Sequence, residues 1–180
     1  MIHDVGLLDR LSSFLTIKFD GEVFRATRKS LDPLTPSVSG GRWAPKGGVS
    51  VLYTSLAKEG ALAELSFHWS QFNPLPSKPA NLHRIALTTR RTLRLLKADL
   101  ESLSVDWVES PKVNCPRTQQ IGAAVAFLGC DGLIAPSARW PTENMMIFSE
   151  NHDVDQNDLK LISTEEVEWI AWAKKNSFIT

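Results

Sequence analysis

The chain has 180 residues, 43% of them hydrophobic, and its 20 basic residues balance 20 acidic ones. This length and apolar content suit one globular domain with a sizeable core, and they leave little room for a second full domain. The zero formal charge provides no global basic field to attract nucleic acid or an anionic membrane. No apolar run approaches the roughly 20 residues of a membrane span, and the N-terminus lacks a secretion signal, so we expect a cytoplasmic protein.

The cysteines and histidines predict neither a disulfide framework nor a metal site. Cys115 and Cys130 have no C-x-x-C spacing, and we expect both to be reduced. The histidines are scattered along the chain at positions His3, His68, His83 and His152. Without a zinc-binding spacing or a Cys/His cluster, they give no metal centre to propose.

The first part of the chain reads as a helix followed by a strand. Leucines at helical spacing predict a structural helix over residues 4–16. Asp20-Gly21 is typical of a turn, and residues 22–27 alternate as a strand that places Val23, Arg25 and Thr27 on one face. The residues alone favour an Arg25 paired with an acid on an edge strand over a functional Arg25.

A glycine-rich stretch follows the proline-containing loop of residues 29–39. Pairs of glycines at 40–41 and 47–48 bracket Arg42 and Trp43, so the backbone can turn tightly and approach a ligand that a Cβ would block. We read this stretch, including Gly41, as a binding loop. Residues 49–54 then alternate as a strand that ends at Tyr53.

The next element is a helix over residues 56–69, for which Thr54 or Ser55 can serve as N-cap. Glu64 lies in its middle, and the small residues Gly60 and Ala61 precede it by one turn. They leave room beside the carboxylate for a ligand, such as a sugar hydroxyl or a developing cation. The alternative is that Glu64 lies on a solvated face, as most helix glutamates do.

Prolines between residues 73 and 79 break regular structure before a predicted strand over residues 82–87. The only basic cluster comprises Arg84, Arg90, Arg91, Arg94 and Lys97. We interpret it mainly as a solvated face, with partner docking as the alternative, because no aromatic residues interleave with it to stack nucleic-acid bases.

The middle of the chain predicts a short mixed segment over residues 99–107 and a proline-punctuated loop over residues 110–116. Thr118 can cap a helix with a buried stripe of Ile121, Val125 and Leu128. A wholly apolar strand over residues 133–135 ends at Pro136, which places Ser137 just past a buried strand. Asn144 precedes another apolar strand over residues 145–148.

The C-terminal part predicts a last strand over residues 159–162 and a helix over residues 164–176. Ser163 and Glu166 have the spacing of a capping box. Trp169 and Trp172 on this helix are more often core residues, although a partly exposed pair would suit a partner. Short strands interspersed with unequal helices, without a regular βαβ repeat, favour an α+β domain.

Several catalytic and nucleotide-binding motifs are excluded. The glycines between 40 and 48 match neither the dinucleotide fingerprint nor the P-loop, and they lie between a loop and a strand. No G-x-S-x-G elbow surrounds Ser137, so a serine hydrolase is weakly supported.

The combination of these motifs resembles the RES-domain family. It comprises Arg25, G-G-R-W at Gly40 to Trp43, V-L-Y-T ending the strand at Thr54, A-L-A-E ending at Glu64, and D-G-L-I-A-P-S-A-R followed by N-M-M-I-F. The resemblance covers about residues 23–148. It implies a small mixed or antiparallel split sheet with flanking helices, similar to the fold of the NAD-consuming ADP-ribosyltransferase toxins.

The resemblance also implies roles for single residues. Arg25, Glu64 and Ser137 would be catalytic, with Glu64 beside the nicotinamide riboside. Arg25 and Arg42 would bind the pyrophosphate, because a guanidinium offers a planar fork of donors. The remaining substrate-binding residues would be Tyr53, whose ring can stack on nicotinamide, together with Gly41, Trp43 and Asn144.

The activity implied is cleavage of NAD at the nicotinamide–ribose bond, with NAD as substrate and no resident cofactor. Water or phosphate would be the acceptor, and a protein side chain as acceptor would make the chain an ADP-ribosyltransferase. A nucleotide-binding module without catalysis is a further alternative. The partner implied is an Xre-like helix-turn-helix antitoxin, in a complex that could contain a homodimer of this chain, without direct nucleic-acid or membrane binding.

Overall fold

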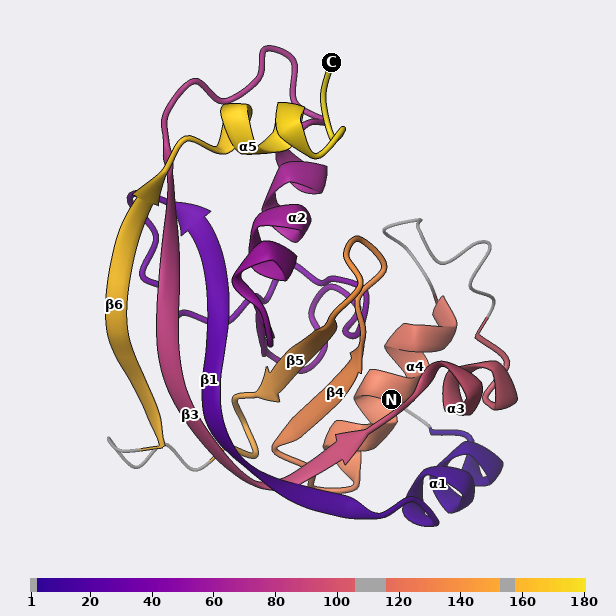
Figure 1. Ribbon diagram of the computed structural model, residues 1–180. Coiled ribbons are helices and arrows are strands. Elements are labelled where there is room, and N and C mark those ends of the chain that lie inside the picture. Colours follow the sequence, from indigo (N-terminus) through magenta and orange to yellow (C-terminus); the bar gives the residue numbers. More distant parts are fainter. Residues whose placement is uncertain (1–2, 106–115, 153–157) are drawn as a thin grey trace.

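The computed structural model describes residues 3–105, 116–152 and 158–180. In chain order its elements are α1 (Val5–Ser12), β1 (Thr16–Arg28), β2 (Val51–Ser55), α2 (Lys58–Trp69), β3 (Ala80–Arg94), α3 (Lys97–Ser102), α4 (Pro116–Phe127), β4 (Gly132–Pro136), β5 (Glu143–Phe148), β6 (Leu159–Val167) and α5 (Trp169–Lys175). Figure 1 shows one mixed sheet with helices at both ends of it. The predicted α+β class is confirmed.

The sheet is divided into two parts that share β3. In one part β3 lies between β1 and β6, and both pairings are antiparallel. In the other part the end of β3, from Thr92 to Arg94, pairs in parallel with β4, and β5 and β2 follow. β1 and β2 meet only at Phe24 and Ser55. Beyond that point the two strands diverge, and this divergence creates room for a site.

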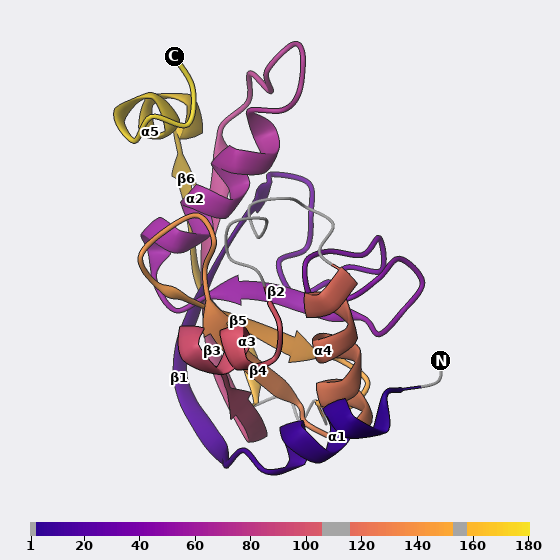
Figure 2. The ribbon, with the colours of Figure 1, turned by 90° about the vertical axis from the view of Figure 1, so that its right-hand side faces the viewer.

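Helices cover the two ends of the sheet (Figure 2). The main core lies where α1, α3 and α4 pack on β4 and β5, and it includes the fully buried Ile121, Leu133 and Phe148. At the other end α5 packs on α2, where Trp169 is 1% exposed and lies against Leu65. Trp169 is therefore a core residue, as the first of the two interpretations predicts, whereas Trp172 is only partly buried.

The predicted capping box at the start of the last helix is wrong. Ser163 and Glu166 belong to β6, which continues to Val167, and α5 begins only at Trp169. The spacing of the two side chains fits a helix N-terminus, but the backbone of this segment pairs with β3. Hydrogen-bonded pairing with β3 therefore decides the conformation of this segment, and the local capping pattern does not.

The N-terminal boundaries also differ from the predictions. The first helix covers eight residues, and β1 begins already at Thr16. Asp20-Gly21 does not form a turn, because both residues pair with β3 inside a strand of 13 residues. A long partner strand therefore determines the backbone at this dipeptide. The predicted strand over residues 82–87 is likewise only part of β3, which has 15 residues.

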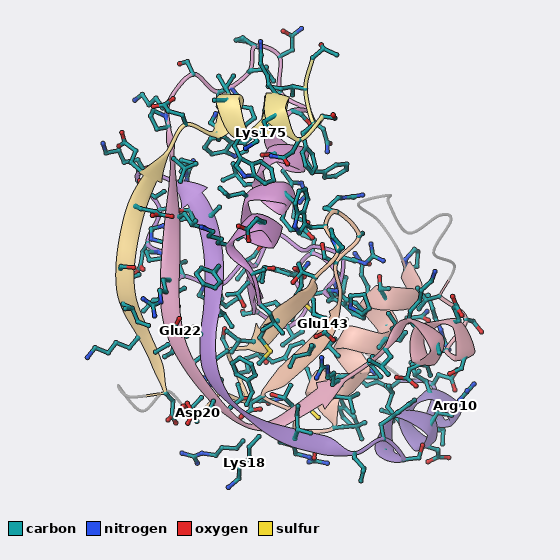
Figure 3. The ribbon with its side chains drawn as sticks, in the orientation of Figure 1. Arg10, Lys18, Asp20, Glu22, Glu143 and Lys175 are labelled. Atoms are coloured by element: carbon teal, nitrogen blue, oxygen red, sulfur yellow. The ribbon has the colours of Figure 1, made fainter. Side chains whose placement is uncertain are left out.

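All five residues of the basic cluster are exposed, as the first interpretation predicts, and its arginines also form local contacts. Arg84 forms an ion pair with Glu22 on β1, and Arg94 binds Glu143 on β5 at 2.5 Å. Figure 3 shows that these two carboxylates lie on different parts of the sheet. The remaining arginines bind elsewhere: Arg90 lies 3.5 Å from Asp158, and Arg91 donates to Leu128 O at 2.8 Å. These arginines hold neighbouring elements together.

The predicted helix caps are wrong, because the side chains bind elsewhere. α2 has Ala57 at its N-cap, without a side-chain cap. Thr54 Oγ1 donates to Met145 O at 2.7 Å, and Ser55 Oγ donates to Glu143 O at 3.3 Å, so both hydroxyls bind the neighbouring strand β5. Thr118 lies inside the first turn of α4 and donates to Arg42 O at 2.7 Å.

Other sequence predictions concern absences or residues that lie outside the described ranges. Cys130 is a free, buried thiol whose pKa is raised by burial. Cys115 and the predicted loop over residues 110–115 lie outside the described residues. Within the described ranges, no group of three or more His, Cys, Asp or Glu side chains is placed to hold a metal ion. No helix in those ranges is long and apolar enough to cross a bilayer.

His83 links the middle of β3 to both neighbouring strands. It is 3% exposed, and its ring nitrogens lie 2.8 Å from Thr27 Oγ1 and 2.8 Å from Thr164 Oγ1. Thr27 donates its own proton to Arg28 O. The neutral ring therefore donates from Nε2 to Thr27 and accepts at Nδ1 from Thr164. Burial and the charge of Arg25 lower the pKa of His83.

We expect the free energy of unfolding to fall as the pH drops below about 6.5. In this range His83 binds a proton in the unfolded chain but stays neutral in the folded protein. His83→Gln should make this fall shallower, as seen in denaturant midpoints between pH 7.5 and 5. His3→Gln, at the N-terminus, is the control and should keep the wild-type slope. An unchanged slope in His83→Gln would contradict the assignment.

Candidate active site

A cavity of about 1140 Å³ opens where β1 and β2 diverge. Its walls come from the end of β1, from the glycine-rich loop, from β2 and from one face of α2. The proline-containing segment after α2 and the tip of the β4–β5 hairpin complete the lining. The cavity therefore collects residues from most of the chain, at a place that exists only because the sheet is split.

Seven of the eight predicted site residues line this cavity, namely Arg25, Gly41, Arg42, Trp43, Tyr53, Glu64 and Asn144. The eighth, Ser137, does not line it but is bonded to one of them: its Oγ donates to Glu64 Oε1 at 2.9 Å. The structure thus brings together residues that the sequence spreads over more than a hundred positions.

Glu64 is held by one donor that directly follows β4 and by one donor in β5. Ser137 Oγ and Asn144 Nδ2 both donate to its Oε1, at 2.9 and 2.7 Å. Of the two small residues before it, Ala61 lines the cavity. The prediction is wrong for Gly60, because Ser55 and Thr142 fill the space beside it. Two donors on one oxygen fix the carboxylate, and among the described residues no donor binds Oε2. That oxygen remains available to a ligand.

Arg25 lies on the cavity wall at the open edge of β1. Its Nη1 donates to Pro33 O at 2.7 Å and to Thr35 O at 2.8 Å, which fastens the loop that follows β1. The structure gives no ion pair between Arg25 and an acid among the described residues. The charge of Asp32 acts on Arg25 only at longer range and raises its pKa slightly against the effect of burial. Burial lowers the pKa of Arg25 to about 10, so the guanidinium is still charged at neutral pH.

The glycine-rich loop is docked against Tyr53 and α4. A Cβ on Gly41 would lie 2.7 Å from Tyr53 Oη, so only glycine fits there. The first turn of α4 also holds the loop: Gln119 Nε2 donates to Gly41 O at 2.9 Å, and Thr118 binds the carbonyl of Arg42. Trp43 is 2% exposed and packs in the main core, so its indole anchors the loop.

The charges around the cavity are strongly asymmetric. Its basic lining residues are Arg25, Arg28, Lys29, Arg42, Lys78 and Arg139. Among the described lining residues Glu64 is the only carboxylate. A concave, cationic cavity with one fixed acid suits an anionic ligand that also carries a group for the acid to bind.

Comparison with known proteins decides the family. The family model described as RES domain matches residues 22–170, which is most of the chain. The chain belongs to the RES-domain family. The fold of this RES domain is similar to a chain in the crystal structure of the M. tuberculosis MbcT–MbcA toxin–antitoxin complex, with a TM-score of 0.80 and 19% identity over 97% of this chain and 98% of that chain. No curated protein matches the sequence.

Sequence reasoning did not select two residues that line the cavity of the RES domain near Glu64. His68 follows Glu64 by one turn of α2, and burial lowers its pKa while the charge of Glu64 opposes this. The spacing of four residues could have pointed to it. Arg139 places its guanidinium 3.4 Å from the centre of the Phe67 ring, and burial lowers its pKa. No sequence signal indicates that stacking.

Tyr53 is the only tyrosine of the RES domain, so its ionisation can be followed by ultraviolet absorbance. Its Oη accepts a hydrogen bond from Trp43 N at 3.3 Å, and burial raises its pKa to about 12. We expect phenolate absorbance from the folded protein only near pH 12. In the unfolded chain Tyr53 ionises near pH 10, so the free energy of unfolding falls above that pH. If the protein unfolds on that account, the absorbance appears earlier. Titration near pH 10 with native circular dichroism would contradict this.

Proposed function

We propose that this chain is the toxin of a toxin–antitoxin pair and that it cleaves NAD at the nicotinamide–ribose bond, with water or phosphate as acceptor. The observation that carries this proposal is the fixed carboxylate of Glu64 in a cavity whose other charged lining residues are all cations. Such a site matches a ligand with a pyrophosphate and a ribose that becomes positively charged during the reaction.

The chemistry assigned to Glu64 is electrostatic. As the bond between ribose C1′ and the pyridinium nitrogen breaks, its electron pair stays on nicotinamide, which leaves as a neutral molecule. The ribose acquires oxocarbenium character, as in glycoside cleavage. Oε2 of Glu64 would accept a hydrogen bond from a ribose hydroxyl and stabilise that charge most strongly when it is largest. The acceptor oxygen then forms a bond to C1′, and a water acceptor releases one proton to solvent in this step.

Binding of the pyrophosphate is assigned to Arg25 and Arg42. Both side chains line the cavity. Their two guanidinium groups would balance the two negative charges of the pyrophosphate in a dinucleotide. Among the described residues the bonds of Arg25 to Pro33 and Thr35 use Nη1 alone, which leaves its other donors for a phosphate oxygen. Tyr53 would present a ring face to nicotinamide while its hydroxyl holds the glycine-rich loop.

The partner in this proposal is a helix-turn-helix antitoxin. The fold likeness to a chain of a solved toxin–antitoxin complex supports the pairing. Production of this chain alone should deplete cellular NAD and arrest growth, and co-production of the antitoxin should restore both. If growth stops while NAD stays constant, NAD cleavage is not the toxic activity.

The direct test is incubation of the purified protein with NAD, with and without phosphate, and mass analysis of the products. Water as acceptor gives nicotinamide and ADP-ribose, and phosphate gives nicotinamide and a phosphorylated ADP-ribose. Label from the adenylate half of NAD that ends up on protein would indicate an ADP-ribosyltransferase instead. Intact NAD together with measurable binding would replace the enzyme by a nucleotide-binding module.

A further inference from the structure

The tip of the β4–β5 hairpin, residues 137–142, determines where Glu64 finds its donors. Ser137 N–H donates to Thr142 O at 2.8 Å, and Thr142 N–H donates to Trp140 O at 2.7 Å, which closes the tip into a compact turn. Ser137 donates to Glu64 from one end of this turn, and Asn144 donates from just beyond the other end. A displacement of the tip would therefore move both donors on Oε1.

The tip rests on two helices. Arg139 stacks on Phe67 of α2, the helix that also carries Glu64. The ring of Trp140 lies 5.5 Å from that of Trp172 on α5. Figure 1 and Figure 2 both show the hairpin tip beside α2, with α5 across the end of α2. The tip is thus supported from the helix of the carboxylate and from a helix that does not line the cavity.

α5 is itself firmly attached. Trp169 packs edge to face on Trp69 of α2, with ring centres 5.2 Å apart, and its Nε1 donates to Pro76 O at 3.0 Å. Phe178, which follows α5, stacks on Trp172 with ring centres 5.7 Å apart. α5 therefore connects α2 with the hairpin tip through Trp169 and Trp172. Aromatic contacts of this kind prefer offset or tilted geometries. They therefore restrain the relative positions of the two elements, in addition to burying apolar surface.

We propose that Trp172 is a positioning residue for Glu64. By holding Trp140, it fixes the hairpin tip and so the two donors that orient the carboxylate. The proposal rests on the proposed function, and it assigns a role to the segment after residue 170, where the family match ends. Trp172 does not line the cavity, and besides Trp140 it packs against the cluster of Ala61, Leu62 and Leu82. A measurement at the hairpin tip itself therefore has to show that its effect passes through the tip.

Two measurements test this in Trp172→Ala. Hydrogen exchange should be at least about tenfold faster at the Ser137 and Thr142 amides, because the closed turn opens more often. The kcat for NAD should fall about tenfold, with KM within about twofold, because orientation of Glu64 matters most in the transition state. Trp172→Phe keeps a ring and should stay within about threefold of wild type in both measurements.

The controls separate positioning from general destabilisation. Ile170→Ala removes a residue of α5 that packs against the cluster of Leu65 and Trp169, and it should lower Tm without changing kcat by more than about twofold. If Trp172→Ala does not fold, Trp140→Ala removes the same ring contact from the hairpin side. In a Ser137→Ala background the Trp172→Ala effect on kcat should shrink below about threefold, because the two residues act on the same carboxylate.

The outcomes are distinguishable. Unchanged exchange at the tip overturns the positioning role, whether or not NAD is consumed. Faster exchange with unchanged kcat overturns it as well, and so does a Trp172→Ala effect that is fully additive with Ser137→Ala. If the wild-type protein leaves NAD intact, the proposed function fails and the catalytic role of Trp172 falls with it, while faster exchange still establishes the structural connection.

Discussion

Glu64→Gln is expected to lower the kcat for NAD cleavage by about 100- to 1,000-fold, with little change in stability. The amide oxygen of glutamine can still accept from Ser137 and Asn144, so the surrounding bonds persist. The substitution removes the negative charge that would oppose the oxocarbenium-like ribose. Because that charge develops in the transition state, the loss should appear in kcat more than in KM. Nicotinamide release under saturating NAD measures it.

The matched control is Glu59→Gln on the same helix. Glu59 lies in the first turn of α2, its side chain is 42% exposed, and it lies 3.9 Å from Lys58, outside the cavity lining. Its kcat should remain within about twofold of wild type, since an exposed ion pair contributes little. A Glu64→Gln enzyme that turns over NAD as fast as Glu59→Gln would remove Glu64 from the mechanism.

Gly122→Ala is expected to destabilise the protein by about 1–3 kcal/mol and to raise KM for NAD. A Cβ at this position of α4 would lie well inside van der Waals contact of the Trp43 carbonyl oxygen. Backbone cannot swing aside as a side chain can, so either α4 or the glycine-rich loop must move. The bonds from Thr118 and Gln119 to that loop would be stretched at the same time. Chemical denaturation and NAD titration measure the two effects.

Gly6→Ala provides the comparison for the same chemical change in a helix. Gly6 lies in α1, where a Cβ would meet only Asp4 Oδ1, at 3.4 Å. Helix propensity then favours alanine by up to about 1 kcal/mol, so this variant should be as stable as wild type or more stable. If Gly122→Ala were equally well tolerated, the loop would not depend on close contact with α4.

The sequence by itself determined the elements whose local pattern agrees with their environment. The apolar runs that form β4 and β5 and the small-residue patterns of α2 and α4 were predicted to within a few residues, because their burial and their periodicity point to the same structure. The same stretches carried the resemblance to the RES-domain family. The candidate residues could therefore be named in advance, although their roles remain predictions.

Only the tertiary structure decided the boundaries of the long strands and the geometry of the site. Residues 163–167 form a strand because their backbone pairs with β3. Thr54, Ser55 and Thr118 do not cap helices because their hydroxyls donate to carbonyl oxygens of other segments. Ser137 and Asn144 lie 73 and 80 positions from Glu64 along the chain. Local sequence cannot encode which oxygen they share, because that contact depends on the packing of α2 beside the β4–β5 hairpin.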